Sequence, residues 1–82
     1  MKRFYIDLFS GIGGFALGTL WADLKFDKHF YSEIDDYSCK VYQKRFPEAI
    51  QLGDVTKINW SEFKCKELNK EPAQVLVTGG FP

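Results

Sequence analysis

The sequence has no excess of charge of either sign, few cysteines, a single histidine and no long hydrophobic run. Eleven basic and eleven acidic side chains cancel among 82 residues, which excludes the strongly positive surface of a domain that holds nucleic acid by itself. The apolar run near the N-terminus is short and is interrupted by Asp7, so it is neither a signal peptide nor a membrane span. We therefore expect a soluble, cytoplasmic protein without a membrane partner.

The two cysteines do not form a recognisable site. Cys39 and Cys65 lie far apart, no Cys-x-x-Cys pair is present, and His29 is the only histidine that could complete a ligand set. This spacing does not match a zinc site, so we predict no metal. We expect both cysteines to be reduced thiols and neither to be a nucleophile.

The rest of the composition favours one small folded domain. Hydrophobic residues make up 45% of the chain and aromatic residues 17%, which is enough for a modest core and argues against disorder. Apolar, β-branched segments alternate with helical patterns, as is typical of a parallel α/β sheet. The predicted strands are residues 3–9, 28–34, 49–52 and 73–78.

Two helices are predicted between these strands. The first begins at Phe15, behind a glycine turn, and the second is capped by Asp35 or Asp36 and ends before Pro47. In the first helix the apolar residues recur at helical spacing at Leu17, Leu20, Trp21 and Leu24. In the second helix the residues that share a face are Cys39, Tyr42 and Phe46. The polar segment 61–71 is expected to be a helix or a surface connection.

Four strands with their helices make only half of a doubly wound sheet. Such a half leaves strand edges and apolar faces uncovered. We therefore expect residues 1–82 to be a partial domain, either a fragment of a larger protein or one subunit of a split protein. The strand at 73–78 is apolar at its centre, so we expect it to be buried.

Glycines and acids follow the predicted strands at their carboxyl ends, where sheets of this kind bind ligands. Glu33 ends the second strand and Asp54 follows the third, whereas Asp7 within the first strand is assigned a structural role. The glycines are Gly11, Gly13 and Gly14 after the first strand and Gly79 and Gly80 after the fourth. Each feature alone has an ordinary explanation, such as a tight turn or a solvated charge. Their coincidence at one edge of the sheet predicts a ligand site.

Two ligand classes are open from these residues. Residues 11–16 fit Gly-x-Gly-x-x-Ala, the pattern of a dinucleotide site with its pyrophosphate at the helix start and Glu33 on a ribose. An adenosine ligand without phosphates fits with Glu33 on the ribose, Asp54 accepting from the adenine amino group, and an amino-acid tail against the glycine loop. Asp54 and Gly14 favour the second class, because neither belongs to the dinucleotide pattern. S-adenosylmethionine is such a ligand.

The chain contains the segments DLFSGIGGF, SEIDDYSCKVYQKRFP, GDVTKI and TGGFP. In order and spacing these four segments resemble the first four sequence blocks of the DNA (cytosine-5)-methyltransferases. The resemblance covers essentially the whole chain. It implies the N-terminal half of a Rossmann-like, S-adenosylmethionine-dependent fold and methyl transfer to C5 of cytosine in DNA, as in restriction-modification systems. The cofactor-binding residues that it implies are Phe9, Ser10, Gly11, Gly13, Gly14, Glu33, Ile34, Asp54 and Val55.

The same resemblance implies a role for each of the main contacts. Phe9 would lie near the adenine, and Ile34 would pack on it. Glu33 would hold the ribose hydroxyls. Asp54, with Val55 beside it, would read the adenine amino group.

The fourth block contains the substrate-side loop, here Gly80, Phe81 and Pro82. In the family this block continues into a cysteine that adds to C6 of a flipped-out cytosine. The sequence ends at Pro82, and neither Cys39 nor Cys65 is expected at this edge, so the resemblance implies no catalytic residue within 1–82. The family's catalytic glutamate and target recognition domain are also missing. We expect the chain to need the rest of the methyltransferase, or a complementary subunit, to act on DNA, and to be inactive alone.

Two other functions remain open at this point. A tRNA cytosine-5 methyltransferase shares these blocks, and the residues around the nucleophile would distinguish it. A dinucleotide-binding or nucleotide-sensing module would share the glycine turn and Glu33. Competition between NADH and S-adenosylhomocysteine would separate that module from a methyltransferase.

Overall fold

Parallel strands form the centre of the computed structural model, which describes residues 2–11, 13–64, 66 and 73–79. The strands lie in the order β3-β2-β1-β4, all parallel. The elements are β1 (Lys2–Leu8), α1 (Gly14–Trp21), β2 (Lys28–Ser32), α2 (Asp36–Arg45), β3 (Ile50–Gln51), the 3-10 turn η1 (Val55–Lys57), α3 (Trp60–Phe63) and β4 (Ala73–Gly79). This arrangement confirms the predicted α/β fold with a parallel sheet, consistent with the N-terminal part of a Rossmann-like methyltransferase.

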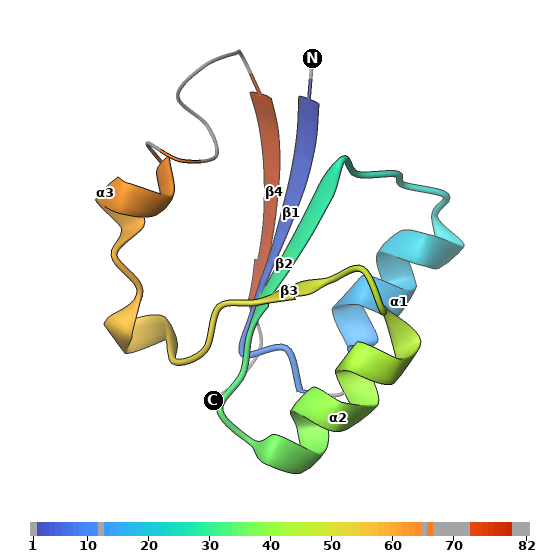
Figure 1. Cartoon of the computed structure of the whole chain (residues 1–82). Coiled ribbons are helices and arrows are strands. Elements are labelled where there is room, and N and C mark those ends of the chain that lie inside the picture. The colour runs from blue at the N-terminus through green and yellow to red at the C-terminus, as the bar shows by residue number, and fades with distance from the viewer. Residues whose placement is uncertain (1, 12, 65, 67–72, 80–82) are drawn as a thin grey trace.

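The sheet carries helices on both faces. Figure 1 shows α1 and α2 on one side of the strands and α3 on the other. Successive residues of a strand point to opposite faces, so Tyr5 and Tyr31 join the core under α1 and α2. On the other face Phe30 meets Phe4 and Phe63 edge to face. Two aromatic layers therefore hold the helices to the sheet.

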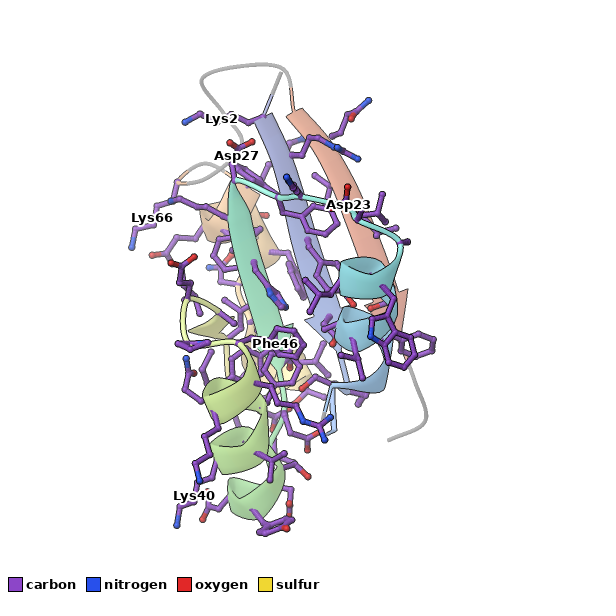
Figure 2. All side chains as sticks on the ribbon, turned by 90° about the vertical axis from the view of Figure 1, so that its right-hand side faces the viewer. Lys2, Asp23, Asp27, Lys40, Phe46 and Lys66 are labelled. Atoms are coloured by element: carbon purple, nitrogen blue, oxygen red, sulfur yellow. The ribbon has the colours of Figure 1, made fainter. Side chains whose placement is uncertain are left out.

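Helix α2 begins and ends where its sequence predicts. The Asp35 carboxylate accepts a hydrogen bond from the Ser38 N–H at 2.8 Å and so caps the first turn. Cys39, Tyr42 and Phe46 pack against the core. Figure 2 shows Phe46 at the end of α2 that lies beside the sheet. The shared apolar face and the stop before Pro47 are both confirmed.

Helix α1 is confirmed, but the face that it buries is not the one that the spacing of its large apolar residues predicts. Its buried residue is Ala16, whereas Leu20 and Trp21 keep 61% and 79% of their surface exposed. A small side chain at position 16 lets the helix approach the aromatic residues of the sheet closely, and its larger residues then face outward. The helix ends at Trp21, before Leu24.

Strand β4 differs from the prediction. It pairs with β1 at the edge of the described sheet, and Val75, Leu76 and Val77 remain 41%, 37% and 53% exposed. The expectation of a buried strand at 73–78 is therefore wrong for the described residues, because β1 is the only strand that borders it there. Of the polar segment 61–71, only the part up to residue 64 and residue 66 is described; its first residues belong to α3.

Asp7 is fully buried in β1 and ties three elements together. The Tyr42 hydroxyl donates to Oδ2 at 3.1 Å, and the Thr78 hydroxyl donates to Oδ1 at 3.0 Å. Burial raises the pKa of the Asp7 carboxyl, and the hydrogen bonds from Thr78 and Tyr42 oppose that rise. The contacts of Asp7 join α2 and β4 to β1, which supports its structural role.

Candidate functional site

Three loops at the carboxyl ends of the strands enclose a cavity of about 300 Å³. This edge lies at the bottom of Figure 1, where β1, β2 and β4 all end. The residues that line the cavity are Phe9, Ser32, Glu33, Ile34, Asp54, Val55 and Thr56. Five residues predicted from the sequence to bind a cofactor are therefore brought together.

Glu33 lies just beyond β2 and joins two of these loops. Its Oε1 accepts a hydrogen bond from the Gly11 N–H at 2.8 Å. Its Oε2 accepts from the N–H groups of Ile34 and Asp35, each at 3.0 Å. Three backbone donors fix the carboxylate, and the lone pair that remains on Oε1 can still accept a hydrogen bond from a ligand hydroxyl.

Phe9 and Ile34 supply apolar walls to the cavity. Phe9 has a φ of 52°, a left-handed conformation that is uncommon for a bulky residue and costs roughly 1–3 kcal/mol. Ile34 keeps 74% of its surface exposed. Apolar groups that flank a cavity in this way suit a flat ring such as a purine.

Asp54 lies on the side of the cavity formed by the loop after β3. Its Oδ1 accepts hydrogen bonds from the Thr56 hydroxyl at 2.7 Å and from the Thr56 N–H at 2.9 Å. The hydrogen bond from the Thr56 side chain, followed by that from its backbone, holds the pKa of the Asp54 carboxyl below its usual range. The carboxylate is therefore ionised near neutral pH and acts only as an acceptor.

The glycines after β1 have different surroundings. A Cβ on Gly13, whose φ is 98°, would lie 2.9 Å from Phe46 Cε2, so this glycine is required by packing against α2. A Cβ on Gly11 or Gly14 would meet nothing within 4 Å. Among the described residues no side chain caps the N-terminus of α1, so a ligand can reach the N–H groups of its first turn. The open space beside Gly14 therefore lies at the uncapped start of the helix.

Ser10 lies beneath the glycine turn. Its N–H donates to the Ser32 carbonyl at 3.1 Å, and the residue is only 7% exposed. Within the described part of the chain, its buried Oγ has no hydrogen-bond partner. Such a group is costly to leave unpaired, so a hydrogen bond from Ser10 Oγ to a polar group of a ligand would be stabilising.

Ser32 and Thr56 line the cavity and were not singled out from the sequence. Ser32 is a small polar residue at the end of a buried strand, and its hydroxyl donates to the Gly53 carbonyl at 2.6 Å. Thr56 follows Asp54 by two positions, the spacing of a side-chain-capped turn. That spacing is a signal that could have identified it.

Gly80, Phe81 and Pro82 lie outside the described residues, as does Cys65. Cys39 lies on α2, where its Sγ accepts from Gln51 Nε2 at 2.7 Å, and burial raises the pKa of its thiol. A protonated thiol in this place is not an activated nucleophile.

The described residues show neither a membrane-spanning helix nor a cluster of metal ligands. They contain no helix that is both long and apolar enough to cross a membrane. They also contain no group of three or more His, Cys, Asp or Glu residues that could hold a metal ion.

Comparison with known proteins identifies similar sequences. The family model described as C-5 cytosine-specific DNA methylase matches residues 4–82. The Type II methyltransferase M.BsuFI of Bacillus subtilis is 37% identical over all of this chain and 17% of its own length. The Type II methyltransferases M1.ScrFI of Lactococcus lactis subsp. cremoris and M.Eco47II of Escherichia coli are 38% and 36% identical over 94% of this chain, and over 17% and 16% of their own lengths. The chain thus spans about a sixth of the length of these relatives.

Proposed function

Because this chain belongs to the C-5 cytosine-specific DNA methylase family, of the restriction-modification type, we propose that its cavity binds the adenosine part of S-adenosylmethionine. We further propose that the protein transfers a methyl group to C5 of cytosine in DNA. The described residues would supply the side of the enzyme that holds the cofactor. The observation that carries this proposal is the convergence of Phe9, Glu33, Ile34 and Asp54 on one cavity.

The chemistry of the donors and acceptors fits an adenosine. Phe9 and Ile34 are apolar and flank the cavity, as a purine ring requires. Glu33 and Asp54 offer acceptors, one toward ribose hydroxyls and one toward an amino group. A dinucleotide would not need the acceptor at Asp54, so this residue favours adenosine.

The start of α1 fits the amino-acid tail of the cofactor. The N–H groups of the first turn attract a carboxylate because the helix dipole is positive there. A Cβ on Gly14 would occupy open space that a ligand can use instead. The unpaired Ser10 Oγ offers a further polar contact in the same loop.

The contribution of these residues to the reaction is binding and orientation. When bound, S-adenosylmethionine supplies an electrophilic methyl group. The hydrogen bonds that fix Glu33 and Asp54 set the carboxylates in place before binding, so less entropy is lost when the ligand is ordered. The positions at which the adenosine and the amino-acid tail are held would then orient the methyl group toward a flipped-out cytosine.

Isothermal titration calorimetry with S-adenosylhomocysteine and with NADH tests the proposal. We expect the wild-type chain to bind S-adenosylhomocysteine and to prefer it to NADH. Asp54→Asn should raise the dissociation constant by about tenfold or more, because the amide keeps the turn cap but presents a donor where the adenine amino group also donates.

Asp23→Asn is the matched control for this substitution. Asp23 is exposed, lies at the far end of α1 from the cavity (Figure 2), and has a φ of 58°, which asparagine tolerates. It should leave the affinity unchanged. Stronger binding of NADH than of S-adenosylhomocysteine would favour a dinucleotide module and overturn the proposal.

A further inference from the structure

We propose that Thr56 is a positioning residue that makes the cavity selective for a 6-amino purine, by holding one oxygen of Asp54 and leaving the other to the ligand. The inference rests on the proposed adenosine site and adds to it the group that sets its selectivity. Thr56 acts through Asp54, although it also lines the cavity.

The first step is the distribution of hydrogen bonds on Asp54. Both donors of Thr56, the hydroxyl at 2.7 Å and the backbone N–H at 2.9 Å, point to Oδ1. In the described part of the chain no donor is bonded to Oδ2. The two oxygens are therefore inequivalent, and Oδ2 keeps its lone pairs for a donor in the cavity.

The second step is the rigidity of the turn that carries Asp54. Gly53 has a φ of 83°, and its carbonyl accepts from the buried Ser32 hydroxyl at 2.6 Å. The Lys57 N–H donates to the Asp54 carbonyl at 2.9 Å. With the backbone anchored on both sides, the direction of the carboxylate depends on rotation of its own side chain, which the Thr56 hydroxyl restricts.

The third step is the chemistry of the purine 6-position. An ionised carboxylate only accepts hydrogen bonds, so Oδ2 pairs with a 6-amino group and is repelled by a 6-oxo group. Discrimination of this kind is strong when the acceptor is fixed and weakens when it can rotate away. By fixing the Asp54 carboxylate, the Thr56 hydroxyl thus makes binding depend on whether the purine carries an amino or an oxo group at its 6-position.

The test compares S-adenosylhomocysteine with its 6-oxo analogue, S-inosylhomocysteine, by calorimetry on the 82-residue chain. The variants are Thr56→Val, which keeps the shape and the backbone N–H but loses the hydroxyl, and Thr56→Ser, which keeps the hydroxyl. Thr19→Val is the matched control, because the Thr19 hydroxyl donates to the Ala16 carbonyl in α1 at 2.7 Å and does not line this cavity.

We expect the wild type to prefer the 6-amino ligand by at least about tenfold. Thr56→Val should reduce the preference by about threefold to tenfold, the worth of one hydrogen bond, whereas Thr56→Ser and Thr19→Val should keep it. In an NMR pH titration, Thr56→Val should bring the pKa of the Asp54 carboxyl back toward its usual range, and Thr56→Ser should not.

The failures can be told apart. If the wild type binds neither ligand, the proposed adenosine site is wrong, and the role proposed for Thr56 is wrong as well. If the wild type binds with the expected preference and Thr56→Val weakens both ligands equally, Thr56 has only a structural role. An unchanged preference in Thr56→Val likewise overturns the inference.

Discussion

Replacing Gly14 by alanine tests whether a ligand lies against the start of α1. Gly14 is the first residue of the helix, and an added Cβ would meet nothing within 4 Å. Alanine is favoured over glycine in helices by about 0.5–1 kcal/mol, so the free energy of unfolding should stay the same or rise slightly. The methyl group would nevertheless enter the space proposed for the cofactor tail. The dissociation constant for S-adenosylhomocysteine should rise at least about tenfold, or about 1.4 kcal/mol.

Gly13→Ala provides the contrast within the same loop. The left-handed conformation at a φ of 98° costs an alanine about 1–2 kcal/mol. The approach of its Cβ to within 2.9 Å of Phe46 Cε2 adds about 1–3 kcal/mol of overpacking. Urea unfolding should therefore show a loss of about 2–5 kcal/mol for Gly13→Ala and none for Gly14→Ala. Wild-type affinity in Gly14→Ala would remove the start of α1 from the site, and equal stability of the two variants would refute the packing argument.

Three further predictions follow from the contacts and burial of individual residues. Glu33→Ala should weaken binding of S-adenosylhomocysteine by roughly 1–3 kcal/mol in calorimetry, because ligand hydroxyls and the Gly11 N–H lose their acceptor; an unchanged dissociation constant would remove Glu33 from the site. Burial lowers the pKa of His29 from 6.5 to about 4, so the unfolded chain binds the proton first as the pH falls. The free energy of unfolding should then drop by about 1–2 kcal/mol between pH 6.5 and 4, after allowance for partial exposure of the ring, and His29→Gln should flatten this pH dependence in thermal melts. Tyr42→Phe should destabilise the fold by about 1–3 kcal/mol in urea, since the buried Asp7 carboxylate loses a donor; a change below 0.5 kcal/mol would contradict the role given to that hydrogen bond.

The elements that the sequence could predict are those whose ends carry strong local signals. Helix α2 has Asp35 at its start and Pro47 after its end, and these residues act through their own backbone geometry. The convergence of Phe9, Glu33 and Asp54 was also predictable. All three follow parallel strands, and the carboxyl ends of parallel strands meet at one edge.

Features that depend on neighbours could not be predicted in the same way. The outward rotation of Trp21 results from how closely Ala16 approaches the sheet, which helical spacing does not encode. The exposure of Val77 depends on which strand borders β4. Gly13 and Gly14 look equivalent in sequence, but only the first faces an aromatic ring of α2.

The cavity owes its shape to the carboxyl end of β2. Ser32 accepts from the Ser10 N–H through its carbonyl and donates to the Gly53 carbonyl through its hydroxyl. Glu33 accepts from the Gly11 N–H. Two adjacent residues in the middle of the site thus hold the loop after β1 on one side and the loop after β3 on the other. Loops that are cross-linked in this way lose little further entropy when a ligand binds. A change at Ser32 should therefore weaken binding by loosening both loops, in addition to any effect on the part of the cavity wall that Ser32 forms. The cavity is therefore built from the hydrogen bonds of one strand end, and the other residues that line it depend on that strand end for their positions.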